Sequence, residues 1–274
     1  MYIKLPPIIY CDDGAVAAQP SPIILDSPHS EKRRTRVLGV IPARLASARL
    51  PRKVLRQIAG RPMLAWVYEA AKACPQLDSV LVATDSEEVA ELCRKHGWAV
   101  QLTSTELPSG TDRIHAIAQQ IDADIYVNIQ GDEPLLTAVH IDALLRPFAR
   151  SHVEVSTIKV RCTAADIANP NAVKVVTAAD GCALYFSRAT IPFDRDGTGA
   201  VYWKHIGLYA YRKDALQRFP TLPHRTLEMT ERLEQLRFLE NGIDLYAEPV
   251  DHDTIGVDTE DDLKQVEQIL LARR

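Results

Sequence analysis

Short apolar runs alternate with single amphipathic segments along the first half of the chain, and this alternation most constrains the fold. Runs of strand length occupy residues 37–41, 79–84, 98–102 and 125–129, with helical apolar spacing between them. Strands separated by single helices form right-handed crossovers and build a parallel sheet covered by helices. The expected fold class is therefore α/β, with a Rossmann-like, mixed but mainly parallel sheet flanked by helices.

The other elements follow from the same periodicities. A helix is expected to open at Arg61-Pro62, because proline suits the first helical position. Further helices are expected at 87–96, 111–121, about 137–149, about 226–240 and 259–272, and further strands at 153–160, 173–176, 183–186, 206–211 and 244–248. The second half is thus expected to extend the sheet and to close over a site.

The first 35 residues differ from the rest. Prolines interrupt any regular element there, and the segment ends in the basic run Lys32-Arg33-Arg34-Thr35-Arg36. The basic residues follow the weakly apolar stretch, which is the reverse of a signal peptide. We expect residues 1–35 to be a disordered extension and residues 36–274 to be a single domain. A basic docking or targeting arm is the alternative.

A cationic loop follows the first expected strand. From Arg44 to Arg56 the chain carries five cations and no acidic residue. Such a loop suits a polyphosphate, because small side chains admit backbone N–H groups and the cations neutralise the phosphates. Neither G-x-x-x-x-G-K-[ST] nor G-x-G-x-x-G is present, so the sequence supports neither a P-loop ATPase nor an NAD enzyme.

Three polar segments are expected to meet at one edge of the sheet. The cationic loop follows the first strand, Asp85 follows the second, and residues 130–134 follow the fourth. In parallel sheets, ligands bind beyond the carboxyl ends of the strands. Asp132 could there hold Mg²⁺ against a nucleotide phosphate, since Mg²⁺ prefers one or two carboxylates with phosphate and water. An ordinary Gly-Asp turn explains the motif equally well.

Other candidate residues also have structural interpretations. Asp258 could cap the last helix, and Thr111 could cap the helix that begins there. Arg188 follows an apolar strand, where its guanidinium could bind a carboxylate. His205 alternates with apolar residues on a strand and could be a packed core residue, and Glu234 and Gln235 could form a solvated helix face.

Composition excludes several classes of protein. The net charge of −4 disfavours a general nucleic-acid-binding role, and no apolar run approaches the roughly 20 residues of a membrane helix. The five cysteines are odd in number and lack C-x-x-C spacing. This disfavours a disulfide framework or a zinc site and indicates a reducing, cytoplasmic environment.

Nine blocks of sequence together resemble the 3-deoxy-manno-octulosonate (Kdo) cytidylyltransferase family, also called CMP-Kdo synthetases. They occur in family order from about Val37 to the C-terminus. The blocks are IPARLASARLP-K, ATDS, SGTDR, VNIQGDEP, NPNAVKVV, ALYFSRATIPFDRD, KHIGLYAYR, LEQLR and GVDT. The block YFSRATIPFDRD separates this family from the sialic acid synthetases, which share only the general start and the fold.

The resemblance implies a nucleotide-diphospho-sugar transferase type of fold and a specific reaction. The family activates Kdo with CTP, releasing pyrophosphate and giving CMP-Kdo for lipopolysaccharide assembly. It is Mg²⁺-dependent, cytoplasmic and usually homodimeric. The expected substrates are therefore CTP and Kdo and the expected cofactor is Mg²⁺, with no nucleic-acid partner and no membrane insertion.

The resemblance also assigns roles to residues. By these roles Arg44, Lys53 and Asp132 would be catalytic, and Asp132 and Asp258 would hold the metal. Ala43, Arg44, Lys53, Ser109, Gly110 and Thr111 would bind the nucleotide. Arg49, Gln130, Arg188, His205, Tyr209, Glu234 and Gln235 would surround the sugar, with Arg188 on its carboxylate. No residue stands out as a general base.

Two departures and three alternatives remain. Arg52 stands where the family usually has glycine, which bears on the role of Lys53, and Asp112 stands where glutamate is common. The same chemistry on 8-amino-Kdo, or on another acid sugar such as sialic acid, needs only one or two changes near the sugar. A silent nucleotide- or sugar-binding paralogue is the third alternative, although such a copy would be expected to lose some of Arg44, Lys53, Asp132 and Asp258.

Overall fold

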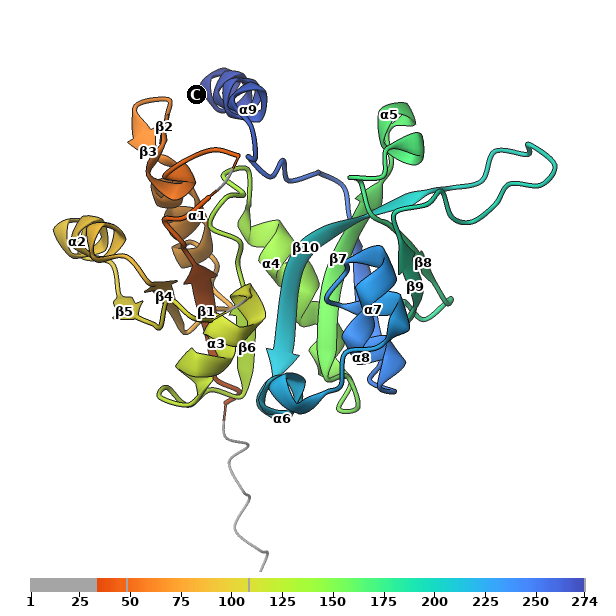
Figure 1. Cartoon of the computed structure of the whole chain (residues 1–274), viewed down its shortest axis with the longest axis horizontal. Helices are drawn as coiled ribbons and strands as arrows, with labels where there is room; N and C mark the ends of the chain where they lie inside the picture. The colour runs from red at the N-terminus through yellow and green to blue at the C-terminus, as the bar shows by residue number, and fades with distance from the viewer. Residues whose placement is uncertain (1–33, 48, 108, 274) are drawn as a thin grey trace, which may run out of the picture. The chain divides into compact units, whose positions relative to one another are not determined.

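A mixed, mainly parallel sheet runs through the body formed by residues 35–274 (Figure 1). The computed structural model describes residues 34–47, 49–107 and 109–273. Within them one path of the sheet has the order β11-β7-β10-β6-β1-β4-β5, and β8 joins β10 to β9. The strands are β1 (Val37–Pro42), β4 (Ser79–Thr84), β5 (Val100–Leu102), β6 (Ile125–Asn128), β7 (Val155–Arg161), β8 (Lys174–Thr177), β9 (Ala183–Ser187), β10 (Trp203–Arg212) and β11 (Leu245–Val250).

The direction of the strands follows the connections between them. β1 is parallel to β4 and β6, β4 to β5, and β11 to β7, whereas β10 is antiparallel to both of its long neighbours, β6 and β7. The carboxyl ends of β1, β4 and β6 therefore lie at one edge of the sheet, where ligands of such sheets bind. The expected α/β class, with a mixed and mostly parallel sheet, is confirmed.

Helices cover both faces of the sheet, because successive strand residues point to opposite sides. Val37 and Ile41 of β1 share a core with α1 and α4, and Leu38 and Val40 share the opposite core with α3 and α6. The helices so placed are α1 (Met63–Lys72), α3 (Gly110–Ala118), α4 (Ala138–Leu145) and α6 (Lys213–Arg218), and α2 (Glu87–Lys95) also contributes to the first core.

A smaller third core lies beneath the edge loops. It joins Leu50, Leu135 and Val257 to apolar residues of the C-terminal helix α9 (Glu260–Ala272) and to the short hairpin of β2 (Gln57–Ile58) and β3 (Arg61–Pro62). These three residues come from the cationic loop, from the segment after β6 and from the segment before α9. Their burial fixes three distant segments to one another, since closely packed apolar side chains tolerate little displacement.

Three expectations about elements are wrong. Arg61-Pro62 forms the short strand β3, because Pro62 keeps an extended backbone, and the helix begins at Met63. The helix expected at 226–240 is broken into α7 (Thr226–Glu231) and α8 (Leu236–Glu240) by the left-handed backbone of Arg232, with φ of 55°. Glu234 and Gln235 therefore lie in the turn between two helices rather than on a helix face.

Several boundaries also differ from the expectations. Ser109 rather than Thr111 caps α3, through reciprocal hydrogen bonds with Asp112. The helix expected at about 137–149 ends as an α-helix at Leu145 and continues as a 3₁₀ turn, Arg146–Ala149, with Pro147 near its start. Helices α5 (Ala164–Ala168) and α6 were not among the elements predicted from the sequence.

Residues 1–33 lie outside the described part of the chain, so the expectation of an N-terminal extension remains a prediction. Among the described residues, no helix is both long and apolar enough to span a membrane. The described cysteines, which are Cys74, Cys93, Cys162 and Cys182, are all free thiols.

Candidate functional site

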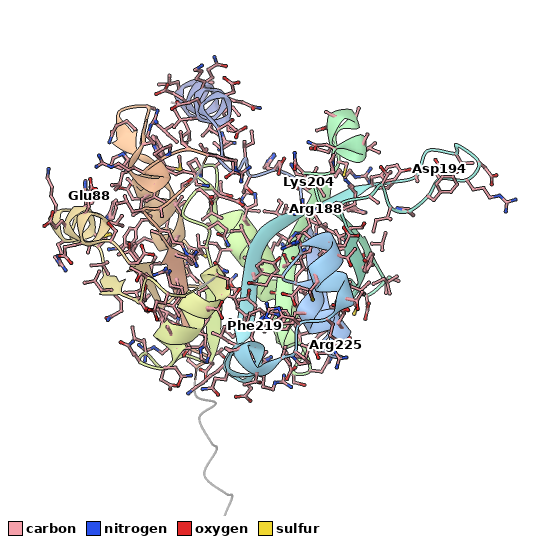
Figure 2. The ribbon with its side chains drawn as sticks, in the orientation of Figure 1. Glu88, Arg188, Asp194, Lys204, Phe219 and Arg225 are labelled. Carbon is pink, nitrogen blue, oxygen red and sulfur yellow. The ribbon has the colours of Figure 1, made fainter. Side chains whose placement is uncertain are left out.

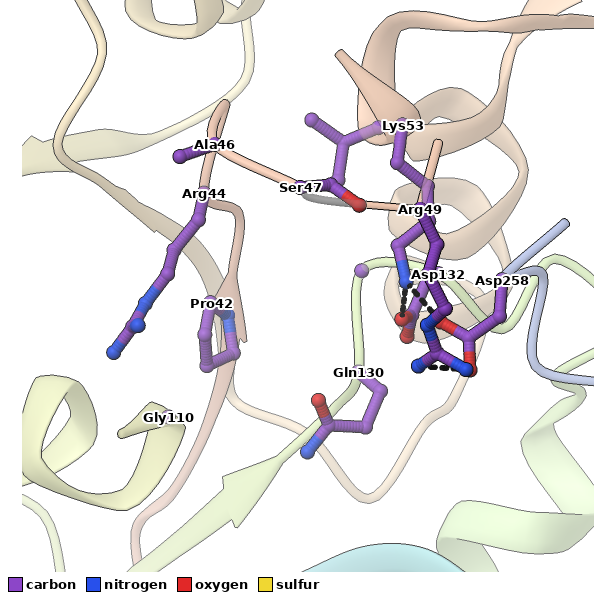
Figure 3. A pocket seen from close by; sticks show the side chains of 12 residues that line it. Pro42, Arg44, Ala46, Ser47, Arg49, Lys53, Gly110, Gln130, Asp132 and Asp258 are labelled. Atoms are coloured by element: carbon purple, nitrogen blue, oxygen red, sulfur yellow. Dashed lines mark hydrogen bonds and ion pairs between the residues drawn. The ribbon is translucent and has the colours of Figure 1, made fainter. Parts of the chain in front are cut away.

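A cavity of about 350 Å³ opens at the carboxyl ends of β1 and β6 (Figure 3). It is lined by residues from the cationic loop, the start of α3, the segment after β6 and the segment before α9. The candidate residues in its lining are Arg44, Arg49, Lys53, Gly110, Gln130, Asp132 and Asp258. The cationic loop and residues 130–132 thus meet as expected, and we call this space the nucleotide cavity.

Two carboxylates face one ammonium group at one side of the nucleotide cavity. Lys53 Nζ lies 2.5 Å from Asp132 Oδ2 and 2.9 Å from Asp258 Oδ1, and Arg49 lies 2.8 Å from the other oxygen of Asp258 (Figure 3). Burial opposes the charge of Lys53, but the two acids outweigh it and raise the pKa of the ammonium. Lys53 therefore stays charged at neutral pH.

Asp132 and Asp258, which we call the acid pair, offer the oxygen ligands that suit Mg²⁺. Two carboxylates open to a cavity leave the remaining positions to phosphate oxygens and water, as this ion prefers. In the described residues no group of three or more His, Cys, Asp or Glu side chains is arranged to hold a metal. Two carboxylates supply only part of the oxygen ligands of Mg²⁺, so the pair fits an ion that a substrate also binds.

Backbone geometry brings the acid pair together. A Cβ on Gly131 would lie 2.9 Å from the Pro42 carbonyl oxygen, so only glycine lets this segment pass so close to the end of β1. The amide of Val257 donates to the carbonyl oxygen of Asp132 at 2.9 Å. This hydrogen bond ties the two carboxylate-bearing segments directly to each other.

Arg52 turns away from the nucleotide cavity. Its backbone is left-handed, with φ of 57°, a conformation that glycine adopts more easily. Its guanidinium pairs with Glu88 at the start of α2. Arg52 therefore adds no cation to the cavity lining, and Lys53 directly after it still reaches both carboxylates.

The opposite side of the nucleotide cavity carries Arg44 and the N-terminus of α3 (Figure 3). Arg44 donates to the carbonyl oxygen of Leu107 at 2.6 Å and keeps other donors for a ligand. Gly110 begins α3, whose N-terminal N–H groups and dipole favour an anion. On this side of the nucleotide cavity, Arg44 and the start of α3 supply positive charge, and both carboxylates of the lining, Asp132 and Asp258, lie on the other side (Figure 3).

Asp85 follows β4 at the same edge of the sheet, as expected, but it does not line the nucleotide cavity. Its carboxylate pairs at 2.9 Å with Arg113, a fully buried residue of α3. The pair links the end of β4 to α3.

A second cavity, of about 700 Å³, adjoins the first and shares Arg49 and Asp258 with it. Arg188 and His205 line it, together with acidic and basic residues that the sequence analysis did not identify. Arg188 donates to the carbonyl oxygens of Glu231 at 2.8 Å and Pro170 at 3.1 Å. These bonds hold its guanidinium in place and leave further N–H groups for an anion. We call this space the second cavity.

His205 is held as a neutral imidazole. Burial lowers its pKa to about 3. The Thr157 hydroxyl donates to the Leu208 carbonyl at 2.7 Å, so it must accept from His205 Nε2, 2.9 Å away. Nδ1 is then an acceptor, which suits a hydroxyl group and not an anion.

Six candidate residues line neither cavity: Ala43, Ser109, Thr111, Tyr209, Glu234 and Gln235. Thr111 is 2% exposed and its hydroxyl contacts Glu234. The Tyr209 ring stacks on Tyr211 and is tilted against His205, and Gln235 is 5% exposed with no hydrogen-bond partner for Nε2 among the described residues. Their binding roles, which the family resemblance implies, remain predictions.

A charged cluster in the second cavity escaped the sequence analysis. Lys204 of β10 pairs with Asp253 and lies 3.8 Å from Asp166 of α5, and buried Glu133 lies nearby. Burial, aided by the charges of Asp132 and Asp253, raises the pKa of Glu133 to about 8. Glu133 adjoins Asp132 in sequence, but nothing in the sequence pattern shows that its carboxyl group is buried.

We expect Glu133→Gln to reduce the loss of stability with rising pH. The folded state keeps the Glu133 proton up to about pH 8, whereas the unfolded chain releases it near its ordinary value of 4.5. This contribution to stability is full below the unfolded pKa and is lost as pH rises through the folded pKa. Urea unfolding from about pH 5 to about pH 9 measures the effect. Exposed Glu106→Gln is the control, and parallel curves for Glu133→Gln and wild type would contradict the prediction.

Comparisons with known proteins identify relatives along most of the chain. The sequence model of a family described as "Cytidylyltransferase" matches residues 38–245. A "3-deoxy-manno-octulosonate cytidylyltransferase" of Acidobacterium capsulatum is 65% identical, over 87% of this chain and 98% of that protein. One of Koribacter versatilis is 56% identical, over 90% of this chain and 95% of that protein. A solved CMP:2-keto-3-deoxy-manno-octonic acid synthetase, complexed with CTP, is 39% identical with a TM-score of 0.85 and covers 88% of this chain and 100% of that chain.

Proposed function

This chain belongs to the 3-deoxy-manno-octulosonate cytidylyltransferase family, and we infer that it transfers CMP from CTP to Kdo and releases pyrophosphate. One structural observation supports this reaction at the site described above. Two adjoining cavities share Arg49 and Asp258, one lined by cations and an acid pair, the other by Arg188 and neutral His205. A nucleotide triphosphate and an acid sugar can therefore meet at a common wall.

We propose that the nucleotide cavity binds the triphosphate. Arg44 and Lys53 approach it from opposite sides, and the N-terminus of α3 adds partial positive charge (Figure 3). Both substrates are anionic, so neutralising their charges and aligning them should carry most of the catalysis. The ammonium of Lys53 is held in place by the carboxylates of Asp132 and Asp258, which stabilise positive charge at this side of the cavity.

Asp132 and Asp258 are proposed to hold Mg²⁺ when the substrates bind. Their oxygens both contact the same ammonium group, which places them close enough to share one cation. The bound ion would supply charge neutralisation at phosphate and a lower pKa for an attacking hydroxyl. Arg49, on the outer oxygen of Asp258, would orient that carboxylate.

The second cavity is proposed to bind the sugar. The Arg188 guanidinium suits the sugar carboxylate, and Nδ1 of neutral His205 can accept from a sugar hydroxyl. The anomeric oxygen then forms a bond to the α-phosphorus of CTP while the bond from that phosphorus to pyrophosphate breaks. The hydroxyl proton leaves to solvent, because no residue at the shared wall is identified as a dedicated base.

Pyrophosphate release tests the proposed function. The enzyme would be incubated with Mg²⁺ and CTP together with Kdo, 8-amino-Kdo, sialic acid or no sugar. We expect release with Kdo. Turnover only with another acid sugar would keep the mechanism and change the substrate, and CTP binding without turnover on any sugar would establish a silent binding protein instead.

We also propose that two copies of the chain form a homodimer. The segment between β9 and β10 extends away from the sheet, and it carries Phe193, which is 85% exposed (Figure 1). Val201 in the same segment and Leu184 of β9 are also exposed, and a group of such side chains is typical of an interface. Light scattering should give twice the mass of one chain, and Phe193→Ser should weaken the dimer. A monomer at micromolar concentration would contradict the proposal.

We place the reaction in the cytoplasm and its product in lipopolysaccharide assembly, as the family does. The free thiols of the described cysteines are consistent with a reducing compartment. Cell fractionation would test the location, and recovery of the enzyme outside the cytoplasm would contradict it.

A further inference from the structure

The carboxylate of Asp258 is carried by a segment without regular secondary structure. Residues 251–259 connect β11 to α9 and include no helix or strand. A side chain in such a segment has no hydrogen-bonded ladder of its own to fix it. Its position therefore depends on contacts that the segment makes with other elements.

Besides the burial of Val257 in the third core and the ion pairs of Asp258 itself, three polar contacts hold this segment to other elements. Val257 N donates to the Asp132 carbonyl, and buried His140 of α4 donates from Nε2 to the His252 carbonyl at 2.9 Å. Thr137 N donates to His140 Nδ1, which leaves the proton on Nε2 and fixes the direction of the second bond. The third contact is the ion pair of Lys204 with Asp253.

The Lys204 ion pair differs from the other two contacts because several acidic side chains surround the Lys204 ammonium. Lys204 lies on β10 and, like Arg188, lines the second cavity (Figure 2), and its side chain is 18% exposed. It contacts Asp253, lies 3.8 Å from Asp166 and faces buried Glu133. Oδ1 of Asp253 is buried and has no hydrogen-bond partner among the described residues. The other carboxylate oxygen of Asp253, Oδ2, forms the ion pair with Lys204.

We propose that Lys204 is a positioning residue for Asp258. Its ammonium draws Asp253 toward β10 and α5, and so holds residues 251–258 in the path that places Asp258 opposite Asp132. Without Lys204, the carboxylates of Asp253 and Asp166 would repel each other and residues 251–258 would move away from β10 and α5. This inference rests on the proposed shared role of Asp132 and Asp258 in binding a divalent cation.

Lys204→Met is the main test variant, because it keeps the length of the side chain and removes its charge. In hydrogen exchange of the metal-free protein, we expect the amides of residues 251–258 to exchange about tenfold faster than in wild type. Lys204→Arg should restore most of the protection. Lys213→Met is the matched control, since it breaks a Lys–Asp ion pair at the other end of β10, with Asp122.

Binding of Mn²⁺ provides a second readout. Electron paramagnetic resonance would follow Mn²⁺ titrated into the enzyme with CTP and no sugar. Loss of a residue that orients a ligand typically weakens metal affinity by about 10- to 100-fold, and we expect a loss in this range for Lys204→Met. Asp253→Asn should show the same direction with a smaller effect, because it removes the repelling charge as well as the contact.

The outcomes separate this inference from the metal proposal. If Asp132→Asn weakens Mn²⁺ binding but Lys204→Met changes neither binding nor exchange, the positioning role is overturned and the metal site stands. If Asp132→Asn also leaves Mn²⁺ binding unchanged, the metal site itself is wrong. Faster exchange throughout the protein in Lys204→Met, with no recovery in Lys204→Arg, would show a general structural role and would also overturn the proposal.

Discussion

Asp132→Asn is expected to lower kcat with CTP and Kdo by about a thousandfold while the protein stays folded. The substitution keeps the size of the side chain and the backbone carbonyl that accepts from Val257, so the segment after β6 should hold its course. It removes one of the two carboxylates that face Lys53. The remaining carboxylate would not hold a divalent cation against the substrates as firmly.

Pyrophosphate release at saturating Mg²⁺, with circular dichroism and thermal unfolding, would measure the effect of Asp132→Asn. Asp142→Asn on α4 is the matched control, since its carboxylate lies at the surface with Arg146 and outside both cavities. Activity near the wild-type level for Asp132→Asn at saturating Mg²⁺ would remove the proposed metal role.

Lys53→Met should lower kcat/KM for CTP by at least about a hundredfold. The Lys53 side chain is 13% exposed, lines the nucleotide cavity and contacts both Asp132 and Asp258. Its removal takes positive charge from the triphosphate site and leaves the two acids facing each other. The free enzyme should therefore lose stability, since carboxylates at such short range repel one another.

Mg²⁺ should partly restore the melting temperature of Lys53→Met, and more strongly than it raises that of the wild type. A cation between the acids would relieve their repulsion and stabilise the folded state by mass action. Differential scanning fluorimetry with and without Mg²⁺ would measure both proteins. Lys264→Met, at an exposed ion pair on α9, is the control. An unchanged KM for CTP together with an unchanged melting temperature would show that Lys53 has neither role.

Much of the nucleotide cavity could be predicted because it follows from topology. Parallel neighbours β4 and β6 bring their carboxyl ends to the same edge as β1, so the cationic loop and Asp132 had to meet. Asp85 also follows a strand of this edge, but its side chain turns to Arg113. Topology fixes where a chain segment lies, whereas the direction of one side chain depends on packing partners far away in the sequence.

The second cavity was harder to predict, because it depends on distant pairs of residues. No periodicity indicates that Lys204 pairs with Asp253 or that Thr111 reaches Glu234. The break between α7 and α8 at Arg232 could not be predicted either, because an arginine, unlike a glycine, does not indicate a left-handed backbone. The resemblance to a family supplied candidates in this region, and the structure shows which of them line the space.

The third core has a consequence for synthesis of the chain on the ribosome. Leu50, Leu135 and Val257 pack together in this core, and they lie close in sequence to Arg49, Asp132 and Asp258, which line the nucleotide cavity. Val257 and α9 are among the last parts to be made, because synthesis proceeds from the N-terminus. A nascent chain can therefore complete much of the sheet while it still lacks Asp258. A product truncated before that residue would retain Lys53 and Asp132 but not the second carboxylate that contacts Lys53.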